Sequence, residues 1–150
     1  MSKSLGNSPD PLDLMDKYST DGVRVGMLLS APAGNDLLFD EKLCEQGRNF
    51  ANKVWNAYRL IQALEIDADK TLPIENKLAV EWLNSKFSQV AAQIEDHFSK
   101  FRISDALMSA YRFVYDDFCA IYLEVIKPPY EGKIDQQSYD TTIDLSLIHI

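Results

Sequence analysis

The segment that decides the fold is DEKLCEQGRNFANKVWNAYRLIQALEI, residues 40–66. Apolar or small residues recur in it at alternating spacings of four and three: Leu43, Gly47, Phe50, Val54, Ala57, Ile61 and Leu64. This spacing follows one face of an α-helix, because a turn takes about 3.6 residues. We therefore predict a long helix from Asp40 to about Ile66 whose apolar face packs in a helical bundle.

The opposite face of this helix carries an aromatic residue between two arginines. At about 100° per residue, Arg48, Asn52, Trp55 and Arg59 lie within about 60° of one another, about 150° from the apolar face. A polar helix face is usually only hydrated. An indole on such a face, however, often packs on another domain or stacks on a ligand. Helical geometry leaves both interpretations open, and these four residues are our candidate contacts with RNA or with another domain.

Two further long helices are predicted downstream. The acidic loop that ends at Pro73 precedes a helix over residues 74–99, and Ser104 is the expected N-cap of a third helix that ends before Pro128. The predicted buried face of the second helix comprises Ala79, Leu83, Phe87, Val90, Ile94 and Phe98. That of the third comprises Leu107, Ala110, Tyr111, Val114, Phe118, Ile121 and Val125. Together these patterns predict an all-α protein built as an antiparallel helical bundle.

Short helices are expected on both sides of the bundle. Asp10 followed by Pro11 is a suitable cap and first position for a helix that extends to Tyr18. Thr20 and the aspartate after it are expected to cap a second short helix. After the bundle, residues 139–145 begin like another helix that the chain has no room to finish.

Composition narrows the classes of function. The chain has 150 residues, enough for one sizeable core, and 46% of them are hydrophobic. No apolar run approaches the roughly 20 residues of a membrane span, and the start lacks the layout of a signal peptide. We therefore expect a soluble, cytoplasmic protein with no membrane partner. The net charge of −8 disfavours a protein that binds DNA, or RNA, by bulk electrostatic attraction.

The cysteines and histidines give no sign of a metal site. Cys44 and Cys119 lie far apart in the sequence and lack the spacing of metal ligands, so we expect reduced, buried thiols. His97 and His149 each stand alone. We therefore predict no metal site and no catalytic arrangement of serine, histidine and aspartate.

The first seven residues, Met1-Ser2-Lys3-Ser4-Leu5-Gly6-Asn7, form an unusual opening. A lysine between hydroxyls that runs into a glycine can fold over a polyphosphate, with the ammonium as a point charge and backbone N–H groups as donors. A mobile N-terminal tail is the alternative. These residues alone leave both open.

The order of these features resembles the C-terminal part of a class I aminoacyl-tRNA synthetase. A Met-Ser-Lys-Ser loop comes first, then a Tyr-x-x-Asp-x-x-Arg helix at Tyr18, Asp21 and Arg24, then three long helices. Asp21 and Arg24 also fit an ordinary ion pair along a helix. The resemblance implies that residues 1–33 are the loop and a helical connector. Residues 34–150 would then be the anticodon-binding bundle.

Among class I enzymes the resemblance is closest to the valyl-tRNA synthetases. The segments that carry it are Gly34-Asn35-Asp36-Leu37-Leu38-Phe39-Asp40-Glu41-Lys42, Arg48-Asn49-Phe50-Ala51-Asn52-Lys53-Val54-Trp55-Asn56 and Tyr115-Asp116-Asp117-Phe118-Cys119-Ala120-Ile121-Tyr122-Leu123-Glu124. The loop alone would fit the isoleucyl, leucyl, cysteinyl or methionyl enzymes equally well. An isoleucyl or leucyl enzyme and a non-enzymatic helical interaction module are the alternatives.

The resemblance implies a catalytic loop in Met1, Ser2, Lys3 and Ser4. These residues match the last four positions of the Lys-Met-Ser-Lys-Ser loop that closes on ATP, without its leading lysine. The full-length enzyme would form valyl-adenylate from valine and ATP and transfer the valyl group to tRNA(Val). Lys3 would neutralise charge on the pyrophosphate leaving group, and the other three residues would shape the loop.

We expect the chain to be a fragment of such an enzyme. Its sequence shows no nucleotide-binding fold, no His-x-Gly-His motif and no editing domain, and residues 146–150 resemble nothing in the family. The fragment should therefore be inactive and should not bind ATP tightly.

Overall fold

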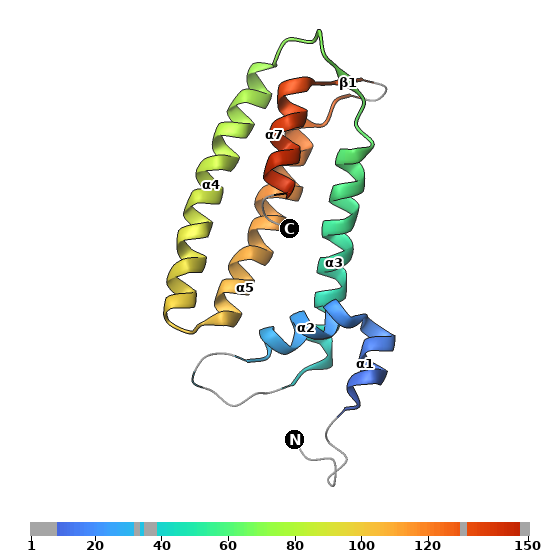
Figure 1. The fold of residues 1–150 in the computed structure, drawn as a ribbon, viewed down its shortest axis with the longest axis vertical. Helices are drawn as coiled ribbons and strands as arrows, with labels where there is room; N and C mark the ends of the chain where they lie inside the picture. Colours follow the sequence, from blue (N-terminus) through green and yellow to red (C-terminus); the bar gives the residue numbers. More distant parts are fainter. Residues whose placement is uncertain (1–8, 32–33, 35–38, 130–131, 148–150) are drawn as a thin grey trace. The chain divides into compact units, whose positions relative to one another are not determined.

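The computed structural model describes residues 9–31, 34, 39–129 and 132–147. These residues are mostly helical, as the sequence predicts (Figure 1). They fall into two compact units: the first combines the described residues up to Lys53 with Ile94–Met108, and the second combines Val54–Gln93 with the residues from Ser109 onward. Among the described helices, none is both long and apolar enough to cross a membrane.

The first unit contains the short helices that precede the bundle. Its elements are α1 (Pro11–Tyr18), α2 (Thr20–Leu29) and the first half of α3 (Glu41–Gln62). It also holds the turn between α4 (Ile74–Ser99) and α5 (Ile103–Arg112). A small apolar cluster joins α1, α2 and α3, and consists of Leu14, Tyr18, Val23 and Cys44, with Met15 and Phe39 packed against it.

The first helix cap is confirmed and the second lies one residue earlier than expected. The Asp10 carboxylate accepts a hydrogen bond from the Leu12 N–H at 2.8 Å, and Pro11 is the first helical residue. In α2 the cap is Ser19, whose hydroxyl accepts from the Gly22 N–H at 3.3 Å. Thr20 already belongs to the helix, so the prediction that it caps α2 is wrong.

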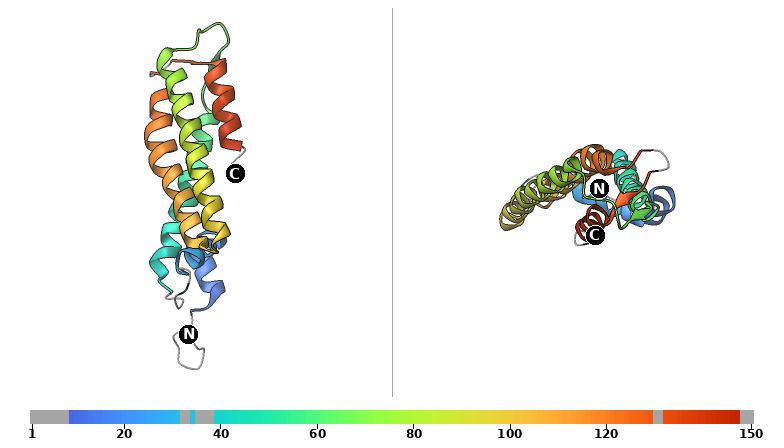
Figure 2. Two further views of the ribbon diagram at one scale, coloured as in Figure 1. Left: turned by 90° about the vertical axis from the view of Figure 1, so that its left-hand side faces the viewer. Right: turned by 90° about the horizontal axis from the view of Figure 1, so that it is seen from above.

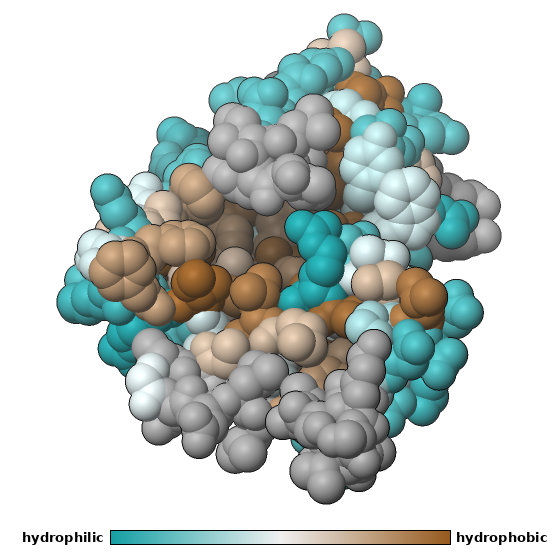
Figure 3. All heavy atoms as spheres, turned by 60° about the horizontal axis from the view of Figure 1, so that its bottom comes forward, coloured by the Kyte–Doolittle hydropathy of each residue, from teal (hydrophilic) through white to brown (hydrophobic). Residues whose placement is uncertain are grey.

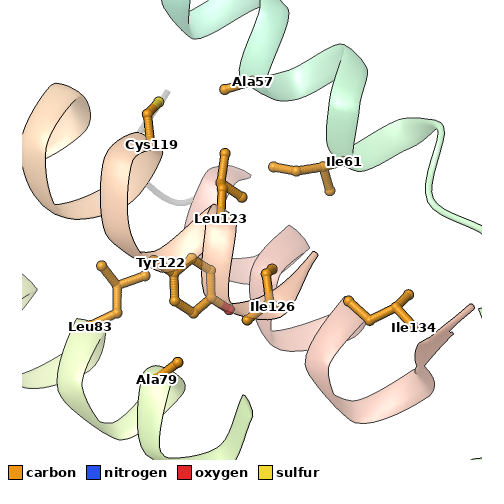
Figure 4. Packing of buried hydrophobic residues seen from close by; sticks show 9 residues of the cluster. All are labelled: Ala57, Ile61, Ala79, Leu83, Cys119, Tyr122, Leu123, Ile126 and Ile134. Atoms are coloured by element: carbon orange, nitrogen blue, oxygen red, sulfur yellow. The ribbon is translucent and has the colours of Figure 1, made fainter. Parts of the chain in front are cut away.

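The second unit contains the bundle. Within it the later part of α3, the main part of α4 and the helical stretch from Ser109 through η2 (Phe113–Tyr122) and α6 (Leu123–Ile126) run antiparallel. Figure 2 shows α4 beside η2 in both views. Their buried side chains meet in one cluster (Figure 4): Ala57, Ile61, Ala79, Leu83, Cys119, Tyr122, Leu123, Ile126 and Ile134. The predicted bundle is therefore confirmed.

Two short strands fix the end of α3. The predicted helix to Ile66 is too long, because α3 ends at Gln62 and β1 (Ile66–Asp67) follows. This strand pairs in parallel with β2 (Ile134–Asp135), with Ile66 opposite Ile134 and Asp67 opposite Asp135. The N–H of Ile134 also donates to the Glu65 carbonyl at 2.9 Å. Backbone groups of residues 65–67 thus bond across to a distant segment instead of continuing the helix.

The last helix, α7 (Gln136–Leu147), starts three residues before the predicted segment and is longer. Asp135 precedes it, is almost fully buried, and accepts a hydrogen bond from the Ser138 N–H at 2.8 Å. The other oxygen of Asp135 accepts from the Asn76 amide at 3.1 Å. In the same unit, the Tyr122 and Thr142 hydroxyls lie 2.7 Å apart. These buried polar contacts hold α7 to α4 and to η2.

The third long helix departs from ordinary α-helical periodicity. Over η2 its backbone hydrogen bonds join residues five apart, as in the bond from the Leu123 N–H to the Phe118 carbonyl. A turn of this kind contains more residues than an α-helical turn, so the buried face shifts along the sequence. The predicted core residues Ile121 and Val125 are therefore exposed, and Cys119, Tyr122 and Ile126 are buried instead.

The ends of the second and third long helices show one confirmed prediction and two errors. Helix α4 has the predicted bounds. Phe98, predicted to be buried, is exposed in the last turn of α4. Helix α5 begins at Ile103, so Ser104 lies within its first turn and is not the cap. Helical periodicity alone does not show where a buried face ends as a helix reaches a turn.

Candidate functional site

The outer face of α3 exposes a tryptophan together with polar and basic residues. Trp55 is 59% exposed, and Asn52 and Arg59 are exposed as well. The Trp55 ring lies 5.8 Å from the Tyr58 ring, tilted by 33°. Among the residues that the structure describes, no carboxylate pairs with the Arg59 guanidinium. An aromatic surface and an available cation therefore stand four residues apart on one helix.

Such a pair has the chemistry for binding a nucleic acid. An exposed indole offers a flat apolar surface on which a base can stack, and an arginine can bond to phosphate or to a base edge. Exposed Asn52 adds an amide that both donates and accepts hydrogen bonds. The arrangement provides binding groups only; it contains no nucleophile and no general acid or base.

Arg48, predicted to share this face, is only half exposed and contacts α1 instead. Its Nη1 donates to the Lys17 carbonyl at 3.3 Å, and its guanidinium lies 5.7 Å from the centre of the Tyr18 ring. Its other terminal nitrogen is 3.8 Å from the Glu45 carboxylate. The structure therefore separates Arg48 from the other three candidates and assigns it to the contact between the connector helices and α3.

Sequence reasoning missed a second contact at this junction. The Lys17 ammonium lies 2.7 Å from Glu41 Oε1, and the Tyr18 hydroxyl donates to the same oxygen at 3.0 Å. The hydrogen bond to Glu41 raises the pKa of Lys17 above its ordinary value, and the same bond lowers the pKa of Glu41. Lys17 and Glu41 are 24 residues apart, so no local pattern in the sequence could have paired them.

The predicted ATP loop lies outside the described residues. This applies to Met1, Ser2, Lys3 and Ser4. Their predicted roles therefore rest on sequence. What the structure does describe is α1, the helix that follows the loop, and its attachment to α3 through Tyr18 and Arg48.

The cysteines behave as predicted. Cys44 and Cys119 are both buried, and both are thiols that form no disulfide. Burial raises the pKa of the Cys44 thiol, so at neutral pH it is an unreactive apolar group. Within the described ranges, no group of three or more His, Cys, Asp or Glu residues is placed to hold a metal ion.

Comparison with protein families gives two matches in succession. Residues 1–40 match the family "tRNA synthetases class I (I, L, M and V)". Residues 80–148 match the family "Anticodon-binding domain of tRNA ligase". The order of the two matches is the order that the sequence resemblance implies.

Curated relatives match almost the whole chain. It is 52% identical to the valine–tRNA ligase of Christiangramia forsetii over 99% of this chain and 18% of the relative. It is 55% identical to that of Bacteroides thetaiotaomicron over 100% of this chain and 17% of the relative. The valine–tRNA ligase of Phocaeicola vulgatus gives 54% identity over 99% of this chain and 18% of the relative. The chain thus spans less than a fifth of the length of these relatives. On these matches, the chain belongs to the valine–tRNA ligase family of class I synthetases and covers a segment that includes its anticodon-binding region.

Proposed function

We propose that this chain is the connector and the tRNA-binding bundle of a valine–tRNA ligase. In full length, that enzyme would activate valine with ATP and transfer it to tRNA(Val). The observation that carries the proposal is the 52 to 55% identity to three valine–tRNA ligases over nearly the whole chain. Such an enzyme would act in the cytoplasm, where translation takes place.

The proposal divides the chain into a catalytic loop with its connector, residues 1–33, and a bundle, residues 34–150. The match to the class I family ends at residue 40, close to this boundary, and the anticodon-binding match falls wholly within the bundle. The contacts of Tyr18 with Glu41 and Arg48 then join the connector to the first helix of the bundle.

In the catalytic loop, Lys3 is the proposed catalytic residue. Its ammonium would neutralise charge that develops on the pyrophosphate leaving group, while Met1, Ser2 and Ser4 shape the loop. In such a displacement the protein acts mainly by positioning and by charge stabilisation. Loss of one preorganised donor typically removes on the order of 3 kcal/mol of transition-state stabilisation. The 150-residue chain alone would be inactive and would bind ATP weakly, because the remaining contacts to the nucleotide lie elsewhere in the full-length enzyme.

In the bundle, Asn52, Trp55 and Arg59 are the proposed tRNA contacts. The exposure of the indole and the lack of a carboxylate partner for Arg59 in the described part of the chain support this role. Arg48 is proposed as an interdomain contact, because its guanidinium already bonds to α1. With a net charge of −8, the chain alone should bind tRNA weakly and in a salt-dependent manner.

ATP–pyrophosphate exchange in the full-length protein tests the catalytic part of the proposal. Valine should support exchange far better than isoleucine or leucine. Lys3→Ala should lower the exchange rate by about 100-fold, the equivalent of roughly 3 kcal/mol. Lys77→Ala, which removes an exposed lysine of α4, is the matched control and should leave the rate unchanged. Exchange that depends on isoleucine or leucine would reassign the enzyme, and no exchange with any of the three would favour an interaction module.

A further inference from the structure

The turn between α4 and α5 exposes three large apolar side chains. Phe101 is 84% exposed, Phe98 is 55% exposed and Ile103 is 45% exposed. All three belong to the first unit and lie within six residues of one another. Figure 3 looks towards this turn and shows apolar side chains, in brown, gathered at the surface on its left. The turn therefore carries three exposed apolar side chains close together in the sequence, which we call the hairpin patch.

The fold of the turn does not explain the phenylalanine at position 101. The Phe101 N–H donates to the Phe98 carbonyl at 3.0 Å, and the Arg102 N–H donates to the His97 carbonyl at 2.9 Å. This pair of bonds is the Schellman motif that ends many helices, and it places Phe101 at the position usually occupied by glycine. Phe101 has φ of 57°, a left-handed conformation that is strained for a bulky residue. A glycine would end α4 without strain and without exposing a ring, so a contact outside the described residues is the simplest reason for the aromatic side chain.

The charges around the patch favour a protein surface over RNA as its occupant. Lys100 lies 2.7 Å from the Asp96 carboxylate, and Arg102 lies 2.7 Å from the Asp105 carboxylate. The two cations next to Phe101 are thus already paired with acids of the same turn. A phosphate backbone needs available cations, because neutralisation of phosphates provides most of the affinity. A neutral apolar surface on a protein needs none.

The area of the patch favours an occupant in the same polypeptide. From their exposed fractions, the three side chains present about 300–400 Å² of apolar surface. A stable complex of separate molecules buries about 800 Å² on each partner. A covalently linked domain needs less area, because the linkage makes its local concentration high. The chain spans only 17 to 18% of the length of its valine–tRNA ligase relatives, so they contain much additional polypeptide.

We propose that the hairpin patch docks on the catalytic part of the same ligase, the segment that precedes the Met1–Ser4 loop in the full-length protein. The inference rests on the proposed function. The patch belongs to the same compact unit as α1, the helix that follows this loop. Phe101 is the anchor of the contact, with Phe98 and Ile103 beside it. Together with the junction of α1 and α3, the contact would hold the catalytic part at two points on the first unit.

Photo-crosslinking in the full-length protein tests this contact directly. A p-benzoylphenylalanine replaces Phe101, the protein is irradiated without tRNA, and mass spectrometry identifies the crosslinked peptides. We expect an intramolecular crosslink to the segment that precedes the loop. The same photoreactive residue in place of Leu78, an exposed apolar residue near the start of α4, is the control and should not give this crosslink. A crosslinked dimer, a crosslink that forms only to added tRNA, or no crosslink at position 101 would each overturn the inference.

A second pair of variants shows whether Phe101 itself makes the contact. With the photoreactive residue at position 98, Phe101→Leu should retain the crosslink and Phe101→Asp should lose it. Both substitutions are at an exposed side chain, so the fold should tolerate them. Equal crosslinking in both would contradict the role of Phe101. The readout needs no activity, and valine-dependent exchange is measured separately, so failure of the docking contact can be distinguished from failure of the proposed function.

Discussion

The crossing of α2 and α3 makes a sharp prediction for Gly26→Ala. A Cβ at Gly26 would lie 2.7 Å from the backbone nitrogen of Cys44, 2.7 Å from its Sγ and 2.8 Å from its Cα. At the same crossing, a Cβ at Gly47 would lie 2.5 Å from the Gly22 carbonyl oxygen. All these atoms belong to the first unit. Two of the three atoms near Gly26 are backbone, so the helices must move apart to accept a methyl group.

Two opposing effects determine how much Gly26→Ala changes the stability of α2. Alanine has a higher helix propensity than glycine by about 1 kcal/mol, which alone would stabilise α2. Overpacking of a tight contact costs about 1–3 kcal/mol, and a clash with backbone atoms belongs at the upper end of that range. We therefore expect Gly26→Ala to lower the free energy of opening of α2 by about 2 kcal/mol.

Native-state hydrogen exchange is the suitable assay, because both tryptophans, Trp55 and Trp82, lie in the second unit and fluorescence would not report on α2. Amides of residues 20–29 should exchange about 30-fold faster in Gly26→Ala, while those of the second unit should not change. Met27→Ala, a partly exposed position of the same helix, is the control. Adding Cys44→Ala should not restore slow exchange, since only the Sγ contact is removed. Exchange as slow as in the unmodified chain would refute the close crossing.

Three further predictions concern single contacts. Phe101→Gly should raise the unfolding free energy of the 150-residue chain by about 0.5–1 kcal/mol in urea titration, because relief of left-handed strain exceeds the added entropy of the unfolded chain. A lower unfolding free energy would argue against the left-handed conformation of Phe101. Asp135→Ala should lower the unfolding free energy by about 2–4 kcal/mol, since it removes a helix cap and leaves the buried Asn76 amide without its carboxylate. Asp135→Asn can still cap α7, so it should lower the unfolding free energy by less. Equal losses of unfolding free energy in the two variants would contradict the capping role of Asp135. Burial raises the pKa of Tyr122, so the folded state holds its proton to higher pH than the unfolded state, and stability should fall as pH rises above about 10. Tyr122→Phe keeps the ring but loses the bond to Thr142, so it should be less stable than the unmodified chain at pH 7. In urea titrations its unfolding free energy should fall less steeply above about pH 10 than that of the unmodified chain. An equally steep fall in both would exclude Tyr122 as the cause.

Much of the bundle follows from local periodicity. The bounds of α4 and the buried face of α3 could be predicted because their apolar residues recur at helical spacing. The register of η2 could not, because its hydrogen bonds join residues five apart and the sequence carries no mark of that change. The pairing of Ile66 with Ile134 likewise depends on bringing two distant segments together.

The candidate site likewise has some features that the sequence could predict and others that it could not. The exposure of Trp55 on a polar helix face could be predicted, since one helix determines it. The attachment of Arg48 to the Lys17 carbonyl could not, because it depends on how α1 packs on α3. Phe101 gave no signal at all: only its backbone conformation and its exposure single it out. Contacts that need two elements, or a special backbone conformation, are the ones that sequence patterns do not reveal.

The central claim, that the outer face of α3 binds tRNA in a valine–tRNA ligase, is tested most directly by steady-state kinetics of the full-length protein with Trp55→Ala. Loss of a stacked base costs about 1–3 kcal/mol, so the KM for tRNA(Val) should rise roughly 5- to 150-fold, while valine-dependent ATP–pyrophosphate exchange stays unchanged. Leu78→Ala is the control and should alter neither value. An unchanged KM for tRNA(Val) in Trp55→Ala would contradict the account.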